Sequence, residues 1–139
     1  MIRTVDDAVE IYRAASERGD IDALMEAIDP DAELVSPLSG HMVFRGEADL
    51  RVLLSGIHST IRDLDWTDSL GEGATRVLVG TFRVGPLRGS DAMVLELGPG
   101  GRIVRMRPHL RPWLPTTLFA LLLVPEIARH PSIVMRALR

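Results

Sequence analysis

The stretch TRVLVGTFRVGPLRGSDAMVLELGPGGRIVRMRPHL, residues 75–110, decides the fold of this chain. Its first run, residues 75–83, is rich in β-branched side chains, and apolar and polar side chains alternate in residues 87–97 and 102–110. Gly85-Pro86 and the GPGG segment at residues 98–101 separate the three runs. A period of two broken by short Gly- and Pro-rich turns predicts consecutive antiparallel strands.

Helices are expected on the N-terminal side of these strands. Apolar side chains at helical spacing predict a first helix, which Gly19 ends: Val5, Ala8, Val9 and Tyr12. Asp20 is placed to cap a second helix with the stripe Ile21, Leu24, Met25 and Ile28. Residues 32–36 predict a short strand closed by Pro37, and residues 42–44 a brief edge strand. A third helix is expected over residues 47–61.

The C-terminal segment is unusually apolar. Residues 115–139 predict two helical pieces broken at Pro125 and Pro131, and the run 118–124 has too many apolar residues for a free helix. This segment is expected to cover a cavity or to pack on a partner subunit. Helices followed by antiparallel strands predict an α+β domain over residues 1–112, with residues 113–139 as a helical tail.

Composition excludes several kinds of chemistry. The 139 residues include no cysteine, lysine, asparagine or glutamine, so thiolate nucleophiles, lysine Schiff bases and side-chain amide donors are all absent. No signal peptide is visible and the longest apolar run is too short for a membrane span, so a cytoplasmic protein is expected. Residues 1–72 carry a net charge of −10 and residues 73–139 one of +7. Without a stacking platform this asymmetry indicates paired or associating surfaces rather than nucleic-acid binding.

Four segments carry a resemblance to a known family: residues 12–24, with Gly19-Asp20 at their centre, and residues 30–37, 44–50 and 101–106. They resemble the nuclear transport factor 2-like superfamily, in its SnoaL-like and ketosteroid-isomerase-like branch. The resemblance implies a cone-shaped fold, an interior pocket and frequent homodimers. Its members include isomerases, polyketide cyclases, dehydratases, epoxide hydrolases and non-enzymatic binding proteins, so the fold alone does not define a function.

The resemblance also implies roles for single residues. Tyr12 matches the tyrosine with which the isomerases stabilise an oxyanion, although a buried core tyrosine is the equal alternative. Ser36 stands where the isomerases carry their catalytic aspartate, and a serine cannot accept a carbon-bound proton without a base beside it. Met93 matches their second acid. Asp91 lies two residues earlier on the same strand face.

Strand parity places Asp91 among inward apolar side chains, where desolvation would raise its pKa and suit it to general acid catalysis. A structural salt bridge to an arginine is the alternative. Arg105, Arg107, His109 and Arg111 share one face of the last strand, which is either outward or, with a bulge near Pro108, turned toward the cavity mouth. His41 and His58 are further candidate bases.

The sequence therefore predicts a cofactor-independent protein for an apolar small molecule. If it is an enzyme, Tyr12 and Asp91 are the catalytic candidates, for a cyclisation, dehydration or isomerisation. The other candidate ligand-binding residues are Ser36, His58, Trp66, Met93 and His109. The alternative is a non-catalytic binding or dimerisation module. A homodimer is expected, and a metal site, a nucleic-acid partner and a membrane span are not.

Overall fold

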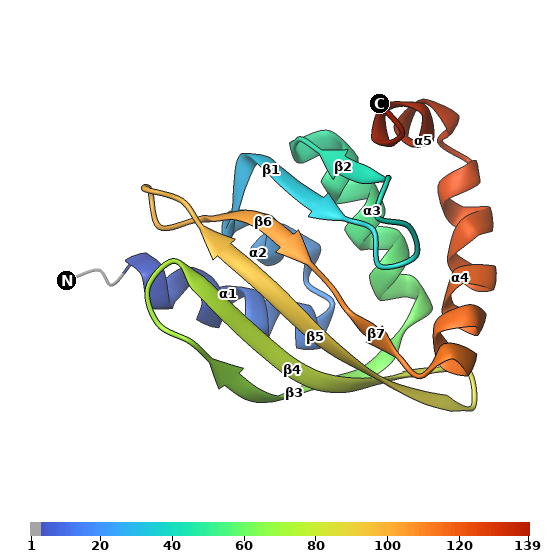
Figure 1. The fold of residues 1–139 in the computed structure, drawn as a ribbon, viewed down its shortest axis with the longest axis horizontal. Coiled ribbons are helices and arrows are strands. Elements are labelled where there is room, and N and C mark those ends of the chain that lie inside the picture. Colours follow the sequence, from blue (N-terminus) through green and yellow to red (C-terminus); the bar gives the residue numbers. More distant parts are fainter. Residues whose placement is uncertain (1–3) are drawn as a thin grey trace.

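The strands form a single curved sheet in the computed structural model (Figure 1), which describes residues 4–139 and, for residues 4–7, the backbone alone. The sheet order is β2-β1-β6-β5-β4-β3, with β7 paired to β5. The strands are β1 (Ile28–Val35), β2 (Val43–Arg45), β3 (Arg62–Leu70), β4 (Thr75–Val84), β5 (Leu87–Leu97), β6 (Ile103–Arg107) and β7 (Leu110–Arg111).

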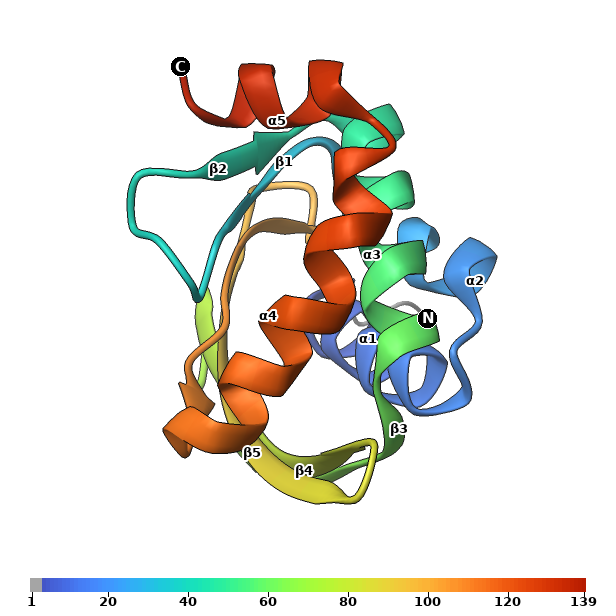
Figure 2. The same cartoon turned by 90° about the vertical axis from the view of Figure 1, so that its right-hand side faces the viewer.

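Helices cover the concave side of this sheet. They are α1 (Thr4–Arg18), α2 (Ile21–Glu26), α3 (Glu47–Thr60), α4 (Trp113–Ala128) and α5 (Pro131–Ala137). Figure 2 shows the sheet on one side, α1, α2 and α3 on the other, and α4 running diagonally across the opening between them. The predicted α+β architecture is confirmed.

The long central strands form as the period-two pattern predicts. Residues 89, 91, 93, 95 and 97 of β5 are buried, while the intervening residues are partly exposed. The last strand differs from the prediction: it divides at Pro108 into β6 and β7. Proline lacks the N–H that a continuous ladder needs. The chain nevertheless keeps its alternation, since Pro108 and Leu110 face the interior and His109 is exposed.

The start of β1 is a second difference. Asp20 caps α2 as predicted, its side chain accepting a hydrogen bond from the N–H of Ala23 at 3.1 Å. However, α2 ends at Glu26, and Ile28 belongs to β1 rather than to the helix. Pro30 is tolerated because the pairing of β1 with β6 is irregular between Ile28 and Glu33. This pairing is parallel. The sequence predicted no neighbour for this strand, because a short strand pattern does not tell which strand it pairs with.

The first helix presents Ala8, Val9 and Tyr12 to the core as predicted, and the side chain of Val5 lies outside the described part. Glu17 and Ser16 at its end fix β3 in place. Glu17 Oε2 accepts a hydrogen bond from the backbone N–H of Trp66, and Ser16 Oγ accepts one from Trp66 Nε1, both at 2.8 Å. These two bonds hold Trp66 in the interior.

The tail packs on the domain as one long helix and one short one. The predicted break at Pro125 is wrong, because α4 continues through this residue to Ala128. Pro125 lies on the exposed side of α4, where water can satisfy the carbonyl group that loses its N–H partner. Gly56 of α3 allows close packing, since a Cβ there would lie 3.3 Å from Leu123 Cδ1. Phe119 meets Phe82 edge to face, with ring centroids 6.5 Å apart.

An ion pair fastens the end of the tail. Arg136 of α5 donates from Nε and Nη2 to the two carboxylate oxygens of Asp49, at 2.9 and 2.8 Å, and the Asp49 side chain is only 12% exposed. We expect Arg136→Ala to lower the free energy of unfolding by more than the loss of an exposed surface pair would, because a nearly buried carboxylate loses its partner. Urea denaturation measures this loss.

The matched control is Arg129→Ala, which removes an exposed arginine 3.7 Å from Glu126 on the same tail. Its expected effect is about 0.5 kcal/mol or less, as for other surface pairs. Equal effects of the two substitutions would contradict a special contribution from the Asp49–Arg136 pair.

Candidate functional site

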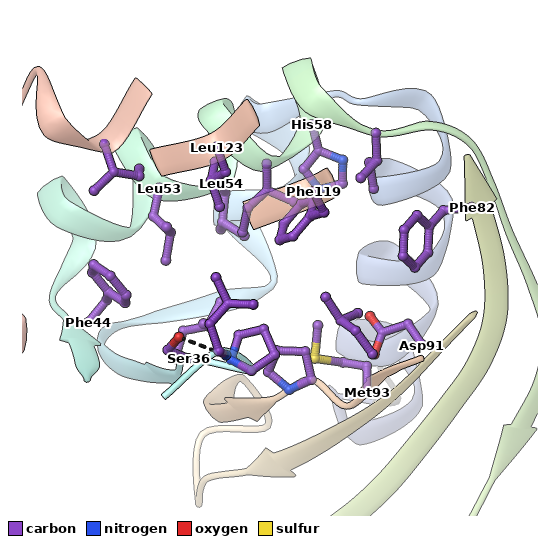
Figure 3. Close-up of a pocket in the computed structure, with 18 of the residues that line it drawn as sticks. Ser36, Phe44, Leu53, Leu54, His58, Phe82, Asp91, Met93, Phe119 and Leu123 are labelled. Atoms are coloured by element: carbon purple, nitrogen blue, oxygen red, sulfur yellow. Dashed lines mark hydrogen bonds between the residues drawn. The ribbon is translucent and has the colours of Figure 1, made fainter. Parts of the chain in front are cut away.

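The curved sheet, α1, α3 and α4 enclose a cavity of about 400 Å³. This volume lies in the range of small-molecule sites. Its lining is almost entirely apolar and comes from elements far apart in the sequence, including Leu34 of β1, Phe44 of β2, Leu54 of α3, Phe82 of β4 and Phe119 of α4. Figure 3 shows these walls, with the few polar side chains spaced around the cavity. Because most of the wall cannot form hydrogen bonds, each polar group on it has a large influence on what can bind.

Asp91 lies on the sheet wall, next to Met93 and Phe82 (Figure 3). Its side chain points inward as strand parity predicts, and the residue is 8% exposed. Oδ1 accepts a hydrogen bond of 3.1 Å from the backbone N–H of His109. The same N–H also donates to the carbonyl oxygen of Ala92, so the hydrogen bond is shared between two acceptors. Burial raises the pKa of Asp91 to about 7, and this shared bond opposes the shift only in part. The carboxyl group is therefore able to exchange a proton near neutral pH.

Tyr12 lies on the α1 wall of the same cavity and is 2% exposed. No hydrogen bond to its hydroxyl group is found within residues 4–139. Burial, and secondarily the nearby charge of Asp91, raises the pKa of the phenol above its usual value. Tyr12 thus stays protonated and can donate to a group inside the cavity. The alternative for Asp91, a salt bridge to an arginine, is not seen among the described residues.

His58 lies on the α3 wall, and Figure 3 shows its ring in the cavity lining next to Phe119. Burial lowers the pKa of the imidazole to about 4. At neutral pH the ring is uncharged and can accept a proton.

Ser36 and Trp66 also line the cavity. Ser36 Oγ accepts hydrogen bonds from the N–H groups of Leu38 and Ser39 at 3.1 and 3.3 Å, and it organises the turn after β1. Its hydroxyl hydrogen remains available for donation. Trp66 has its ring nitrogen bonded to Ser16, so the indole contributes an apolar surface. In all, six of the seven candidate residues line this one cavity: Tyr12, Ser36, His58, Trp66, Asp91 and Met93.

His109 is the exception. It is exposed on the outer face of the sheet, and its Nδ1 lies 3.1 Å from the carbonyl oxygen of Ala92. The alternation across Pro108 is kept, so no bulge turns the side chain inward. His109 therefore does not line the cavity in this structure, and its role at the site is its backbone N–H, which donates a hydrogen bond to Asp91 Oδ1.

The arginines of the last strand also face outward. Arg107 Nε lies 3.4 Å from Glu96 Oε2. Arg105 lies between two acids, with Nε 3.9 Å from Glu33 Oε1 and Nη1 4.0 Å from Glu96 Oε2. The acids of neighbouring strands thus neutralise part of this basic face. The described residues offer no cluster of three histidine or acidic side chains that could hold a metal ion.

The sequence predicted that the tail covers a cavity or packs on a partner subunit, but none of the individual α4 residues was assigned to the site. Phe119, Leu123 and Ile127 are buried, and all three line the cavity. Their spacing of four residues was a usable signal, because it marks one face of a helix. Within residues 4–139 no single helix is long and apolar enough to cross a membrane, and α4 and α5 meet that test only together, across a bend of 113°.

Comparison with known proteins agrees with this architecture. The family pattern of the SnoaL-like domain matches residues 9–107, and the chain belongs to this family. The comparison with curated proteins found no match.

Solved structures share the whole shape at low sequence identity. An uncharacterised protein with a cystatin-like fold from Silicibacter pomeroyi DSS-3 superposes with a TM-score of 0.88 at 14% identity, over 97% of this chain and 96% of that one. A steroid delta-isomerase from Pseudomonas aeruginosa gives 0.83 at 19% identity, over 95% and 97%. A de novo designed protein with a curved β-sheet gives 0.68 at 15% identity, over 85% and 94%.

The first two structures match the tail as well as the rest of the chain. The resemblance seen in the sequence ended before the tail, and the family pattern ends there too. Matches over 97% and 95% of this chain must include most of residues 113–139. The tail helices are therefore part of a shared fold. The structure holds one chain, so the homodimer stays a prediction.

Proposed function

We propose that this chain binds an apolar small molecule carrying a carbonyl or hydroxyl oxygen and performs cofactor-independent acid/base chemistry on it, of the isomerase, cyclase or dehydratase class. The observation that carries the proposal is the pair of Asp91 and Tyr12 on the wall of an otherwise apolar cavity. A protonated carboxyl group and a phenol can both donate to one ligand oxygen. In a site without bulk water such donors stabilise developing negative charge strongly.

The lining also supports a neutral ligand. Arginine is the only cationic side chain besides histidine in this chain, and no arginine lines the cavity within residues 4–139. A carboxylate or phosphate would enter without a charged partner and would lose its hydration. Membership in the SnoaL-like family is compatible with isomerase or cyclase chemistry. Position 36 at the end of β1 is a serine, so no carboxylate is available there to act as the base.

The test compares two ligands that differ by one oxygen, 1-tetralone and the hydrocarbon tetralin. Binding is followed through the fluorescence of Trp66, which lines the cavity, in a Trp113→Phe background that removes the exposed second tryptophan. We expect the wild-type cavity to prefer the ketone. Tyr12→Phe and Asp91→Ala should each weaken ketone binding about tenfold, as expected for one lost hydrogen bond, and leave tetralin binding unchanged.

The control is Asp65→Asn, which removes an exposed carboxylate on β3. It should bind both ligands as the parent does. Equal ketone affinity in the parent, Tyr12→Phe and Asp91→Ala proteins would contradict the proposed roles of both side chains.

A further inference from the structure

Only one of the four histidines in this chain is placed to act on a bound ligand. His58 lines the cavity, whereas His41, His109 and His130 are exposed at other positions. His58, Tyr12 and Asp91 are the titratable groups of the lining within residues 4–139. Asp91 and Tyr12 come from β5 and α1, and His58 comes from α3 (Figure 3). A ligand between these walls would meet proton donors and the imidazole from different sides.

The surroundings of His58 suit a proton acceptor. No hydrogen bond to its ring is found within residues 4–139, so the accepting nitrogen is not occupied by the protein. His58 lies in the last turn of α3, where the helix dipole favours a positive charge on the imidazolium that proton uptake creates. Burial lowers the pKa of the ring to about 4, which keeps it neutral at pH 7 with an unprotonated nitrogen. The same shift makes it a weaker base than a free imidazole, so proton uptake depends on the helix dipole and on the two donors at the ligand oxygen.

We propose that His58 is the catalytic base of this cavity, acting on a neutral, largely hydrocarbon ketone whose carbonyl oxygen is held by Asp91 and Tyr12. This inference rests on the proposed function and adds to it the base and the substrate class. His58 on the α3 wall would thus act as the base in a chain that has a serine, Ser36, at the end of β1 and no carboxylate there.

The step conserves atoms and electrons. His58 takes a proton from the carbon next to the carbonyl group, the C–H electron pair becomes a C=C bond, and the carbonyl π pair moves to oxygen. Asp91 and Tyr12 donate hydrogen bonds to that oxygen, and Asp91 can transfer its proton to form the enol. The imidazolium then returns a proton to carbon, at the same position or at a conjugated one, and Asp91 regains its own. The net result is hydrogen exchange or isomerisation, without an oxidant, reductant or co-reactant.

The experiment measures this proton transfer directly. Wild-type protein is mixed with 1-tetralone in D₂O, and the loss of the hydrogens next to the carbonyl group is followed by NMR. We expect His58→Ala to slow the enzymatic exchange about 100-fold or more, the usual contribution of a general base. Added imidazole should restore part of the rate in His58→Ala and have no such effect on the wild type. A merely structural role would not give this rescue.

His41→Ala, which removes an exposed histidine, is the matched control and should exchange at the wild-type rate. Ketone binding is read in the same samples through Trp66 fluorescence. Bound ketone with equal exchange in wild type and His58→Ala, or with none in either, would overturn the assignment of His58 and leave the proposed binding role standing. A wild type that shows no preference for ketone over tetralin would overturn the proposed function, and this inference with it.

Discussion

Asp91→Asn becomes progressively more stable relative to wild type as the pH rises from about 4 to 7, gaining about 3 kcal/mol over this interval. The folded protein holds the pKa of Asp91 at about 7, against 3.8 for an aspartate side chain exposed to water in the unfolded chain. Between these values the unfolded chain has released the proton and the folded chain still binds it. The wild type therefore loses stability as the pH rises, and asparagine removes that loss.

His58→Phe shows the opposite trend. The pKa of His58 is about 4 in the folded protein and 6.5 in the unfolded reference, so between pH 6.5 and 4 the unfolded chain binds the extra proton. The wild type loses stability as the pH falls through this range. Phenylalanine should therefore gain about 3 kcal/mol relative to wild type between pH 6.5 and 4.

Urea denaturation at half-unit pH steps measures both differences, and comparison with wild type cancels the titration of all shared groups. Tyr12→Phe is the control from the same cavity: its phenol has a pKa raised above the usual value of 10, so its difference from wild type should be flat between pH 4 and 8. A flat difference for Asp91→Asn would mean that the carboxyl group is hydrated in the folded protein, which would contradict a dry cavity around it.

The candidate site was visible in the sequence only as far as local periodicity reaches. The alternation in residues 87–97 correctly directs Asp91 inward, and the helical stripe of Tyr12 does the same for the phenol. Periodicity tells which face a side chain occupies, but not which groups meet across a cavity. That Asp91 faces α1 rather than an arginine depends on the sheet's curvature, which is a tertiary property.

The errors have the same origin. Proline was expected to end a helix at Pro125, yet this proline lies on an exposed helix face and the helix continues. Of the two alternatives for the last strand, the outward face is seen, because the alternation is kept across Pro108. Ile28 fits a helical stripe, but it pairs with Ile103, which is 75 residues away in the sequence. Pairing between strands that are far apart in the sequence thus overrides the short helical pattern at Ile28.

Gly80→Ala is expected to lower the free energy of unfolding by about 3 kcal/mol or more. Gly80 of β4 pairs with Trp66 of β3 on one side and with Asp91 of β5 on the other. A Cβ at this position would lie 2.4 Å from the carbonyl oxygen of Asp65 and 2.9 Å from both Cα and Cε3 of Trp66. Two of these three atoms are backbone atoms, so rotation of a side chain cannot relieve the overlap.

Strand β3 cannot move away cheaply either. Trp66 is held by its bonds to Glu17 and Ser16 of α1, both at 2.8 Å, and a shift of β3 would stretch them and withdraw the indole from the cavity. The register of β3 and β4 already changes just after Trp66, so the strand is bent at this point. Glycine at position 80 is what lets the bent strand lie close.

Thermal unfolding followed by circular dichroism measures the effect, with an expected decrease in Tm of about 10 °C for a chain of this size. Gly100→Ala in the hairpin between β5 and β6 is the control: no atom lies within 4 Å of its added Cβ and its φ is not positive, so its Tm should stay close to that of wild type. Trp66 fluorescence gives a second measure, because a displaced β3 exposes the indole and shifts its emission to longer wavelength. A Gly80→Ala protein with the Tm and emission of wild type would contradict the close approach of β3 to Gly80 of β4. It would also contradict the positioning of β3 by the two hydrogen bonds of Trp66 to α1.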